Sequence, residues 1–107
     1  MRQPESVLKK SILEYLNLNG HLVWSNKSTG TYDPRTRKFR KNNGKFEING
    51  VSDILGITKD FRPLALEVKT STGRVSDSQK AFLERFQSYH GLCGVVRSIE
   101  DCEALGL

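Results

Sequence analysis

The sequence lacks a long apolar run, because no stretch approaches the roughly 18–20 apolar residues that a membrane-spanning helix needs. Hydrophobic residues make up 36% of the 107-residue chain, which is low but compatible with a globular protein. No apolar region follows residues 1–5, so no signal peptide is predicted. We expect a single cytoplasmic domain over residues 1–107, with one modest core.

Cysteine and histidine are also scarce, with two of each. Cys93 and Cys102 form neither a disulfide framework nor a metal-binding motif, and Cys93 lies in an apolar run that favours a buried free thiol. His21 and His90 have no partner at the spacing of a metal site or catalytic triad, so we interpret them as surface or capping residues. We find no internal repeat, low-complexity tract or Walker-type glycine loop.

Charge is present and unevenly distributed, with 17 Lys and Arg against 12 Asp and Glu, a net charge of +5. Six cations form one short basic stretch: Arg35, Arg37, Lys38, Arg40, Lys41 and Lys45. A local basic stripe is the expected footprint of a protein that binds a phosphate backbone. A solvated, charge-rich loop explains it equally well, and charge alone does not decide between them.

Hydrophobic periodicity predicts a mixed sheet with helices on its faces, in an α-β-β-β-α-β-α core. Pro4 and the spacing of Leu8, Ile12 and Leu16 predict a first helix that Asn19-Gly20 ends. The expected helices cover residues 4–19, 77–90 and 99–105, and the expected strands cover residues 21–25, 45–48, 53–58, 64–70 and 92–96. Residues 26–44 are expected to form a polar loop, which is longer than a simple connection between two elements needs and is therefore expected to be functional or mobile. We interpret Trp24 as a core residue.

Two of these strands bring charged side chains together. Glu67 follows Asp53 at a spacing of fourteen positions, which suits adjacent antiparallel strands joined by a turn at residues 60–63. Glu67 and Lys69 share one strand face, while Leu66 and Val68 share the other. Two carboxylates and a lysine are then expected at one spot, an arrangement that holds a hard cation and hydrolyses phosphodiesters.

A magnesium ion suits this spot, because it needs only one or two carboxylates besides water and substrate phosphate. Asp53 and Glu67 are the expected ligands, with the backbone carbonyl of Val68 as a plausible third. Lys69 would position the attacking water or neutralise charge on the phosphate. The alternative is a Glu67–Lys69 ion pair on a wet sheet face, which the strongly apolar neighbours disfavour.

Gln79 allows two interpretations that the spacing leaves open. The run Ser76-Asp77-Ser78-Gln79 is a good capping box, in which Gln79 reaches back to the Ser76 amide. The same residue stands on the stripe of Phe82, Leu83 and Phe86, which faces the sheet and the expected site.

Two acidic residues of the first helix compete for a role near the site. Glu5 shares its face with Leu8 and Ile12 and points toward one end of the core, whereas Glu14 falls on the polar side. We therefore expect Glu5 to be the site residue, although an acidic first turn also suits the helix dipole.

The ordered motifs resemble the virus-type replication-repair nuclease (VRR-NUC) family of the PD-(D/E)XK nuclease superfamily. The resemblance covers nearly the whole chain, and its strongest parts are Gly50-Val51-Ser52-Asp53-Ile54-Leu55-Gly56, Leu66-Glu67-Val68-Lys69, Gly73-Arg74-Val75-Ser76 with Gln79, and residues 91–99. Pro4-Glu5-Ser6 and Trp24-Ser25-Asn26 add weaker support. Ser52 stands where the superfamily nominally has proline.

The resemblance implies a restriction-endonuclease-like α/β fold and a Mg²⁺- or Mn²⁺-dependent DNA endonuclease. It assigns metal binding to Asp53 and Glu67 and catalysis to Lys69. It also implies that Gln79 and Glu5 lie near the active site. It further implies a phage-type homodimer, in a bacterium or phage-infected cell, that cleaves branched DNA as a Holliday junction resolvase does. A restriction- or flap-type nuclease and a non-catalytic nucleic-acid-binding module are the alternatives.

Overall fold

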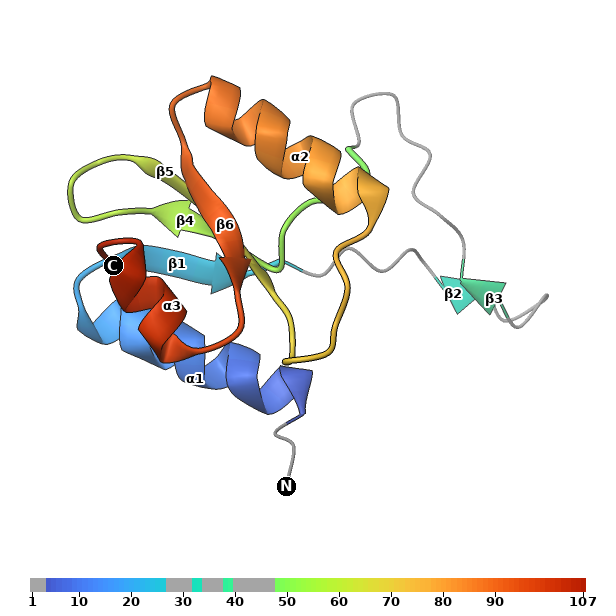
Figure 1. The fold of residues 1–107 in the computed structure, drawn as a ribbon, viewed down its shortest axis with the longest axis horizontal. Helices are drawn as coiled ribbons and strands as arrows, with labels where there is room; N and C mark the ends of the chain where they lie inside the picture. Colours follow the sequence, from blue (N-terminus) through green and yellow to red (C-terminus); the bar gives the residue numbers. More distant parts are fainter. Residues whose placement is uncertain (1–3, 27–31, 34–37, 40–47) are drawn as a thin grey trace.

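The structure, a computed structural model, describes residues 4–26, 32–33, 38–39 and 48–107 (Figure 1). Its elements confirm the expected α/β class. In chain order they are α1 (Glu5–Leu18), β1 (Leu22–Ser25), β2 (Tyr32–Asp33), β3 (Lys38–Phe39), β4 (Ile54–Ile57), β5 (Pro63–Val68), α2 (Asp77–Ser88), β6 (Leu92–Val96) and α3 (Ile99–Ala104).

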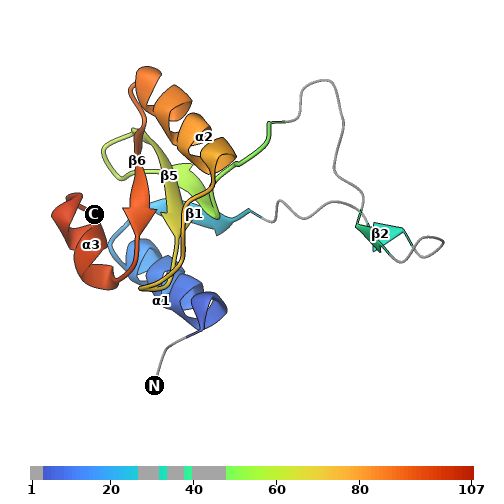
Figure 2. The ribbon, with the colours of Figure 1, turned by 45° about the vertical axis from the view of Figure 1, so that its right-hand side comes forward.

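A four-stranded mixed sheet with the order β1-β4-β5-β6 forms the centre of the molecule. The first three strands are antiparallel, and β6 runs parallel to β5 because α2 carries the chain back along the sheet. Helices α1 and α2 lie on opposite sides of the sheet (Figure 2). Strands β2 and β3 pair with each other in a separate two-stranded sheet.

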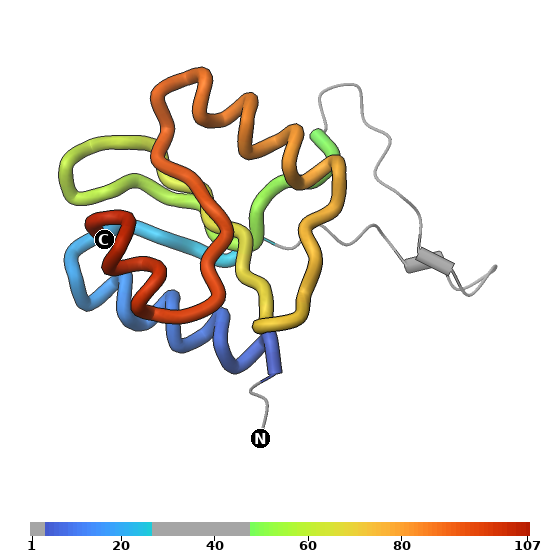
Figure 3. Tube along the Cα trace, in the orientation of Figure 1, coloured from blue at the N-terminus to red at the C-terminus, as the bar shows by residue number. Residues whose placement is uncertain are grey.

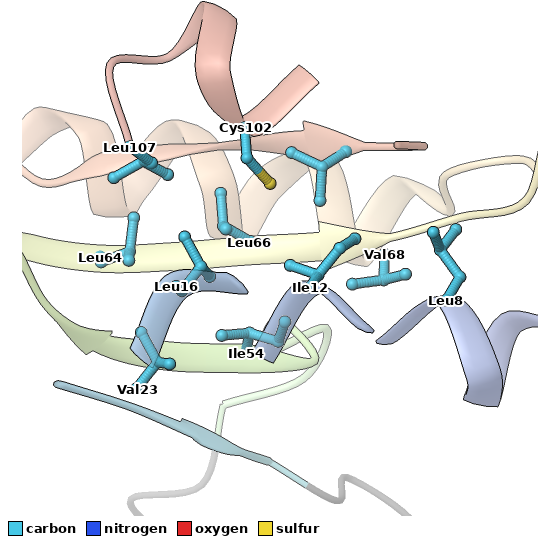
Figure 4. Packing of buried hydrophobic residues seen from close by; sticks show 11 residues of the cluster. Leu8, Ile12, Leu16, Val23, Ile54, Leu64, Leu66, Val68, Cys102 and Leu107 are labelled. Atoms are coloured by element: carbon cyan, nitrogen blue, oxygen red, sulfur yellow. The ribbon is translucent and has the colours of Figure 1, made fainter. Parts of the chain in front are cut away.

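The core lies between α1 and the sheet. Leu8, Ile12 and Leu16 form the buried stripe of α1, as their spacing predicted. In Figure 4 they face alternate side chains of β5, which are Leu64, Leu66 and Val68. Burying each such side chain contributes about 1.5–3 kcal/mol, so this contact fixes which face of β5 points toward α1.

The remaining helices close the two sides of the sheet. On the side of α2, the Cys93 thiol donates a hydrogen bond to the Leu83 carbonyl at 3.3 Å. On the side of α1, Cys102 of α3 is fully buried. Both cysteines are free, but Cys93 is only half-buried, so the expectation of a buried thiol was wrong for this residue. Figure 3 shows the C-terminus returning beside the end of α1, where the Tyr15 hydroxyl donates to the Leu107 carbonyl at 3.0 Å.

The interpretations of Trp24 and His21 were also wrong. Trp24 is 49% exposed and not part of the core, because the core-facing residue of β1 is Val23. His21 is buried, and its Nδ1 accepts a hydrogen bond from the Lys59 backbone N–H at 3.1 Å. His90 is exposed, as predicted.

The expected strand over residues 45–48 falls mostly outside the described residues, and Ile48, which is described, is not in a strand. The basic stretch also lies outside them, except for Lys38, whose backbone forms part of β3. Helix α2 ends at Ser88, two residues before the predicted end.

Candidate active site

The β4–β5 hairpin sets the two predicted carboxylates opposite each other. Because Ile54 pairs with Leu66, Asp53 and Glu67 lie opposite each other one step beyond this pair, on the sheet face away from α1. The Asp53 Oδ2 atom accepts a hydrogen bond from the Val68 N–H at 3.0 Å. This bond holds the Asp53 carboxylate against the last residue of β5.

Glu67 is a buried carboxyl group with an unusual pKa. The residue is 1% exposed. The pKa of its carboxyl group is raised from 4.5 to about 8, chiefly by burial and then by the neighbouring Asp53 carboxyl group, against the lowering effect of Lys69. A strongly shifted carboxyl beside a second carboxyl is typical of a functional site.

Lys69 lies beside Glu67, as the strand alternation predicted. Its Nζ is 3.7 Å from Glu67 Oε1, and its side chain is 15% exposed. The turn that follows supports the aliphatic stem, since a Cβ on Gly73 would lie 3.3 Å from both Cβ and Cδ of Lys69. The Arg97 guanidinium holds this turn by donating to the carbonyls of Thr70 and Gly73.

Gln79 satisfies both interpretations that the sequence left open. Its Oε1 accepts from the Ser76 N–H at 2.8 Å, and the Ser76 hydroxyl accepts from the Gln79 N–H at 3.2 Å, which completes the capping box. Its Nε2 donates to Glu67 Oε1 at 2.8 Å. The carboxamide therefore links the start of α2 to the buried carboxyl group.

Gly50 lets the chain pass close to the same helical turn. Its φ of 77° is the left-handed conformation that favours glycine. A Cβ at this position would lie 2.3 Å from the Ser78 carbonyl oxygen and 2.7 Å from the Gln79 nitrogen. Both conditions exclude a side chain here without displacement of the first turn of α2.

Asn26 is a site residue to which sequence reasoning gave no role. Its backbone N–H donates to the Asp53 carbonyl at 2.7 Å, and its Nδ2 donates to the Ser52 carbonyl at 3.3 Å. Asn26 thus holds the backbone from which the Asp53 carboxylate projects. It occurs in the weakly matching run Trp24-Ser25-Asn26, but its contacts depend on the pairing of β1 with β4, which residue spacing does not reveal.

The two acidic residues of α1 differ as expected in their relation to the site. The negative charge of Glu5 contributes to the raised pKa of Glu67. Glu14 is exposed and is not among the causes of that shift. Glu5 is also exposed, so the prediction that it points toward the core was wrong, and its influence on the carboxyl pair is electrostatic.

The carboxyl pair fits a divalent cation. Glu67 Oε2 is buried without a hydrogen-bond partner among the described residues, and it is an oxygen of the type that magnesium binds. Over the same residues, no group of three or more His, Cys, Asp or Glu side chains could hold a metal ion. Two carboxylates suffice for magnesium, whose remaining ligands are commonly water and substrate oxygens.

Within the described part of the chain, no helix is long and apolar enough to cross a membrane. In a comparison with protein families, the model of the VRR-NUC domain matches residues 22–100, a span that includes Asp53, Glu67, Lys69 and Gln79 but not Glu5. Searches among curated proteins and among solved structures found no match. The chain therefore belongs to the VRR-NUC family, which has the PD-(D/E)XK fold and a nuclease-type function.

Proposed function

We propose that the protein is a divalent-metal-dependent DNA endonuclease that selects branched structures, as a Holliday junction resolvase does. One observation carries the proposal: Glu67, buried and facing Asp53, keeps one oxygen without a partner among the described residues while Lys69 and Gln79 engage the other. Leaving a buried carboxylate oxygen unpaired is costly, so the arrangement favours a cation at that oxygen.

Asp53, Glu67 and the carbonyl of Val68 would hold Mg²⁺ or Mn²⁺, which when bound supplies charge that acidifies water and stabilises phosphate oxygens. The protein's own groups have separate tasks. Gln79 fixes the orientation of the Glu67 carboxylate through its 2.8 Å hydrogen bond. Lys69 keeps a positive charge beside the reacting phosphate and either orients the attacking water or neutralises the developing negative charge.

The substrate preference rests on the resemblance and on the charge distribution. In this proposal the basic stretch binds the phosphate backbone, and a homodimer presents two sites to two strands of a four-way junction. A restriction- or flap-type nuclease would use the same chemistry on another DNA shape. A non-catalytic binding module is disfavoured, because two carboxylates at the site would repel the DNA polyanion and would have no catalytic role to justify that repulsion.

Cleavage of a substrate panel tests this function. Labelled four-way junction, flap, duplex and single-stranded DNA of shared sequence would be incubated with the protein in Mg²⁺, in Mn²⁺ and in EDTA. We expect metal-dependent cuts placed symmetrically in the junction, and slower or no cleavage of the linear duplex. Preferential cutting of the flap would replace the resolvase assignment, and DNA binding without cleavage under every condition would favour the binding module.

A further inference from the structure

An exposed tryptophan lies on the sheet face that carries the two carboxylates. Val23 of β1 is buried in the core beneath the sheet, so its neighbours Leu22 and Trp24 point to the opposite face. Trp24 is 49% exposed although it is a large aromatic residue in a strand. The chain has one tryptophan, and it is presented to solvent.

The strand register sets Trp24 close to Asp53. Trp24 pairs with Leu55 and Ser25 with Ile54, and one step further the Asn26 N–H donates a hydrogen bond to the Asp53 carbonyl at 2.7 Å. Trp24 and Asp53 are therefore diagonal neighbours on one face of an antiparallel pair. Such neighbours are about 7–8 Å apart, within reach of an aromatic side chain.

The surroundings of Trp24 are apolar on one side and charged on the other. Leu22 and Ile57, which pair with each other across β1 and β4, are 62% and 43% exposed on the same face. In the opposite direction along the strands lie Asp53 and Glu67. If a phosphate of a DNA strand reached the carboxyl pair, a base of the same or the adjoining nucleotide would lie at the indole ring of Trp24.

We propose that Trp24 stacks on an unpaired nucleobase next to the phosphodiester bond that is cleaved. This inference rests on the proposed nuclease function and deepens it by naming a substrate feature. Stacking on an aromatic ring accepts any base, because every base has a π-face, but it requires that the base has left its own stack. Trp24 therefore favours single-stranded or distorted DNA at the cut site over regular duplex.

Fluorescence of the single tryptophan tests the stacking directly. The Glu67→Gln variant, which we expect to bind DNA without cutting it, would be titrated with a single-stranded oligonucleotide, with the duplex of the same sequence and with a series carrying one abasic site at each position. Anisotropy of a label on the DNA gives the saturation in each titration. We expect strong quenching by the single strand, weaker quenching by the duplex, and loss of quenching at one or two abasic positions.

Two substitutions of Trp24 and one control variant separate stacking from simple hydrophobic contact. Trp24→Leu should raise the KM for cleavage of single-stranded or branched DNA about five- to a hundredfold with little change in kcat, and Trp24→Phe should recover most of the loss. Leu22→Ala is the matched control, since it removes apolar surface from the same face without removing an aromatic ring. We expect it to leave KM nearly unchanged.

Three results would overturn the inference. They are unchanged fluorescence at DNA saturation, equal KM in Trp24→Leu and wild type, and a fluorescence that depends on protein concentration without DNA, which would assign Trp24 to a contact between two copies. None of these affects metal-dependent cleavage by the wild type. Absence of that cleavage would instead remove the proposed function, so the two failures are distinguishable.

Discussion

At the scale of single residues, the Gln79 carboxamide joins a structural and a functional contact. One end completes the cap of α2 with Ser76, and the other end donates to Glu67. Sequence reasoning left these as alternatives because a capping box and a site contact need the same position, N3 of the helix. They coexist because an amide has a separate acceptor and donor.

This division of tasks predicts different outcomes for Gln79→Ala and Ser76→Ala. Ser76→Ala removes the hydroxyl cap and should cost about 1 kcal/mol of stability with nearly normal cleavage, because the contact of Gln79 with Glu67 remains. Gln79→Ala should also lower kcat about tenfold or more, because the Glu67 carboxylate loses its orientation. Urea unfolding and single-turnover cleavage measure the two effects. Equal losses of activity in both variants would assign Gln79 to helix capping alone.

The raised pKa of Glu67 predicts a pH-dependent stability in metal-free protein. The unfolded chain ionises Glu67 near 4.5 and the folded protein near 8, so the folded state holds the extra proton between these values. The contribution of Glu67 to the free energy of unfolding should therefore be highest below about pH 4.5. It should fall as the pH rises to 8, by up to about 1.4 kcal/mol per pH unit.

Unfolding in EDTA between pH 5 and 8 measures this slope. Glu67→Gln should flatten it, because the amide does not ionise, and the exposed Glu14→Gln is the control that should keep it. Metal affinity should rise over the same range, because the ligand must lose its proton. A stability that rises with pH in the wild type, or a slope unchanged in Glu67→Gln, would contradict the assignment of the shifted pKa to Glu67.

At the scale of elements, the site depends on how tightly the chain before β4 packs against the start of α2. Gly50→Ala should displace this turn and separate Gln79 from Glu67, since the added Cβ would lie 2.3 Å from the Ser78 oxygen. The matched control is Gly106→Ala, because Gly106 has a similar φ of 85° but nothing within 4 Å of an added Cβ. Both variants therefore place an alanine in a strained left-handed backbone conformation, but only in Gly50→Ala does the added Cβ also clash with the start of α2.

We expect Gly50→Ala to lower cleavage at least about tenfold more than Gly106→Ala, with calorimetry showing weaker metal binding in the former alone. Similar activities in the two folded variants would show that the close approach at Gly50 has no bearing on the site.

The sequence predicted those elements whose patterns are one-sided. The stripe of Leu8, Ile12 and Leu16 and the alternation of β5 each have one apolar face, so their orientation was readable. Strand β1 has consecutive apolar residues, Leu22, Val23 and Trp24, so alternation could not say which faces the core. The wrong assignment of Trp24 followed from this, and the burial of His21 depends on a distant backbone N–H that no local pattern reveals.

In the candidate site, too, local sequence patterns predicted some contacts, whereas contacts between distant segments were not predictable. Asp53, Glu67 and Lys69 come from one hairpin, whose register follows from a short turn, and the structure brings them together. Asn26 and Arg97 support them from segments remote in the sequence, and Gly50, just before Asp53, packs against the distant start of α2. Their contacts depend on tertiary packing and were not predictable from spacing.

At the scale of the whole molecule, the net charge of +5 is expected to act mainly through the basic stretch. Neutralising Arg37, Lys38, Arg40 and Lys41 together should weaken DNA binding and reduce the slope of log K against log salt by about 0.9 for each lost phosphate contact. Metal binding should not change. The control neutralises Lys59 and Arg62, two exposed cations at the opposite end of the β4–β5 hairpin from Asp53 and Glu67.

Filter binding or anisotropy from 50 to 300 mM salt measures both slopes. A slope that falls in the control by the same amount for each charge removed would mean that DNA responds only to net charge. Sedimentation with and without junction DNA adds the oligomeric state, for which the resolvase proposal expects a dimer. A monomer in both conditions would leave the nuclease chemistry in place but favour a flap or nicking activity.

The central claim is that Asp53 and Glu67 hold a divalent cation that cleavage requires. Its most direct test measures single-turnover cleavage of a four-way junction against Mg²⁺ concentration for wild type, Asp53→Asn and Glu67→Gln, with folding checked by circular dichroism. These variants keep the size of the side chains and remove the charge. We predict saturable dependence on Mg²⁺ in the wild type, no cleavage in EDTA, and losses on the order of a hundredfold or more in each variant. Undiminished cleavage in EDTA, or in both folded variants, would contradict the account.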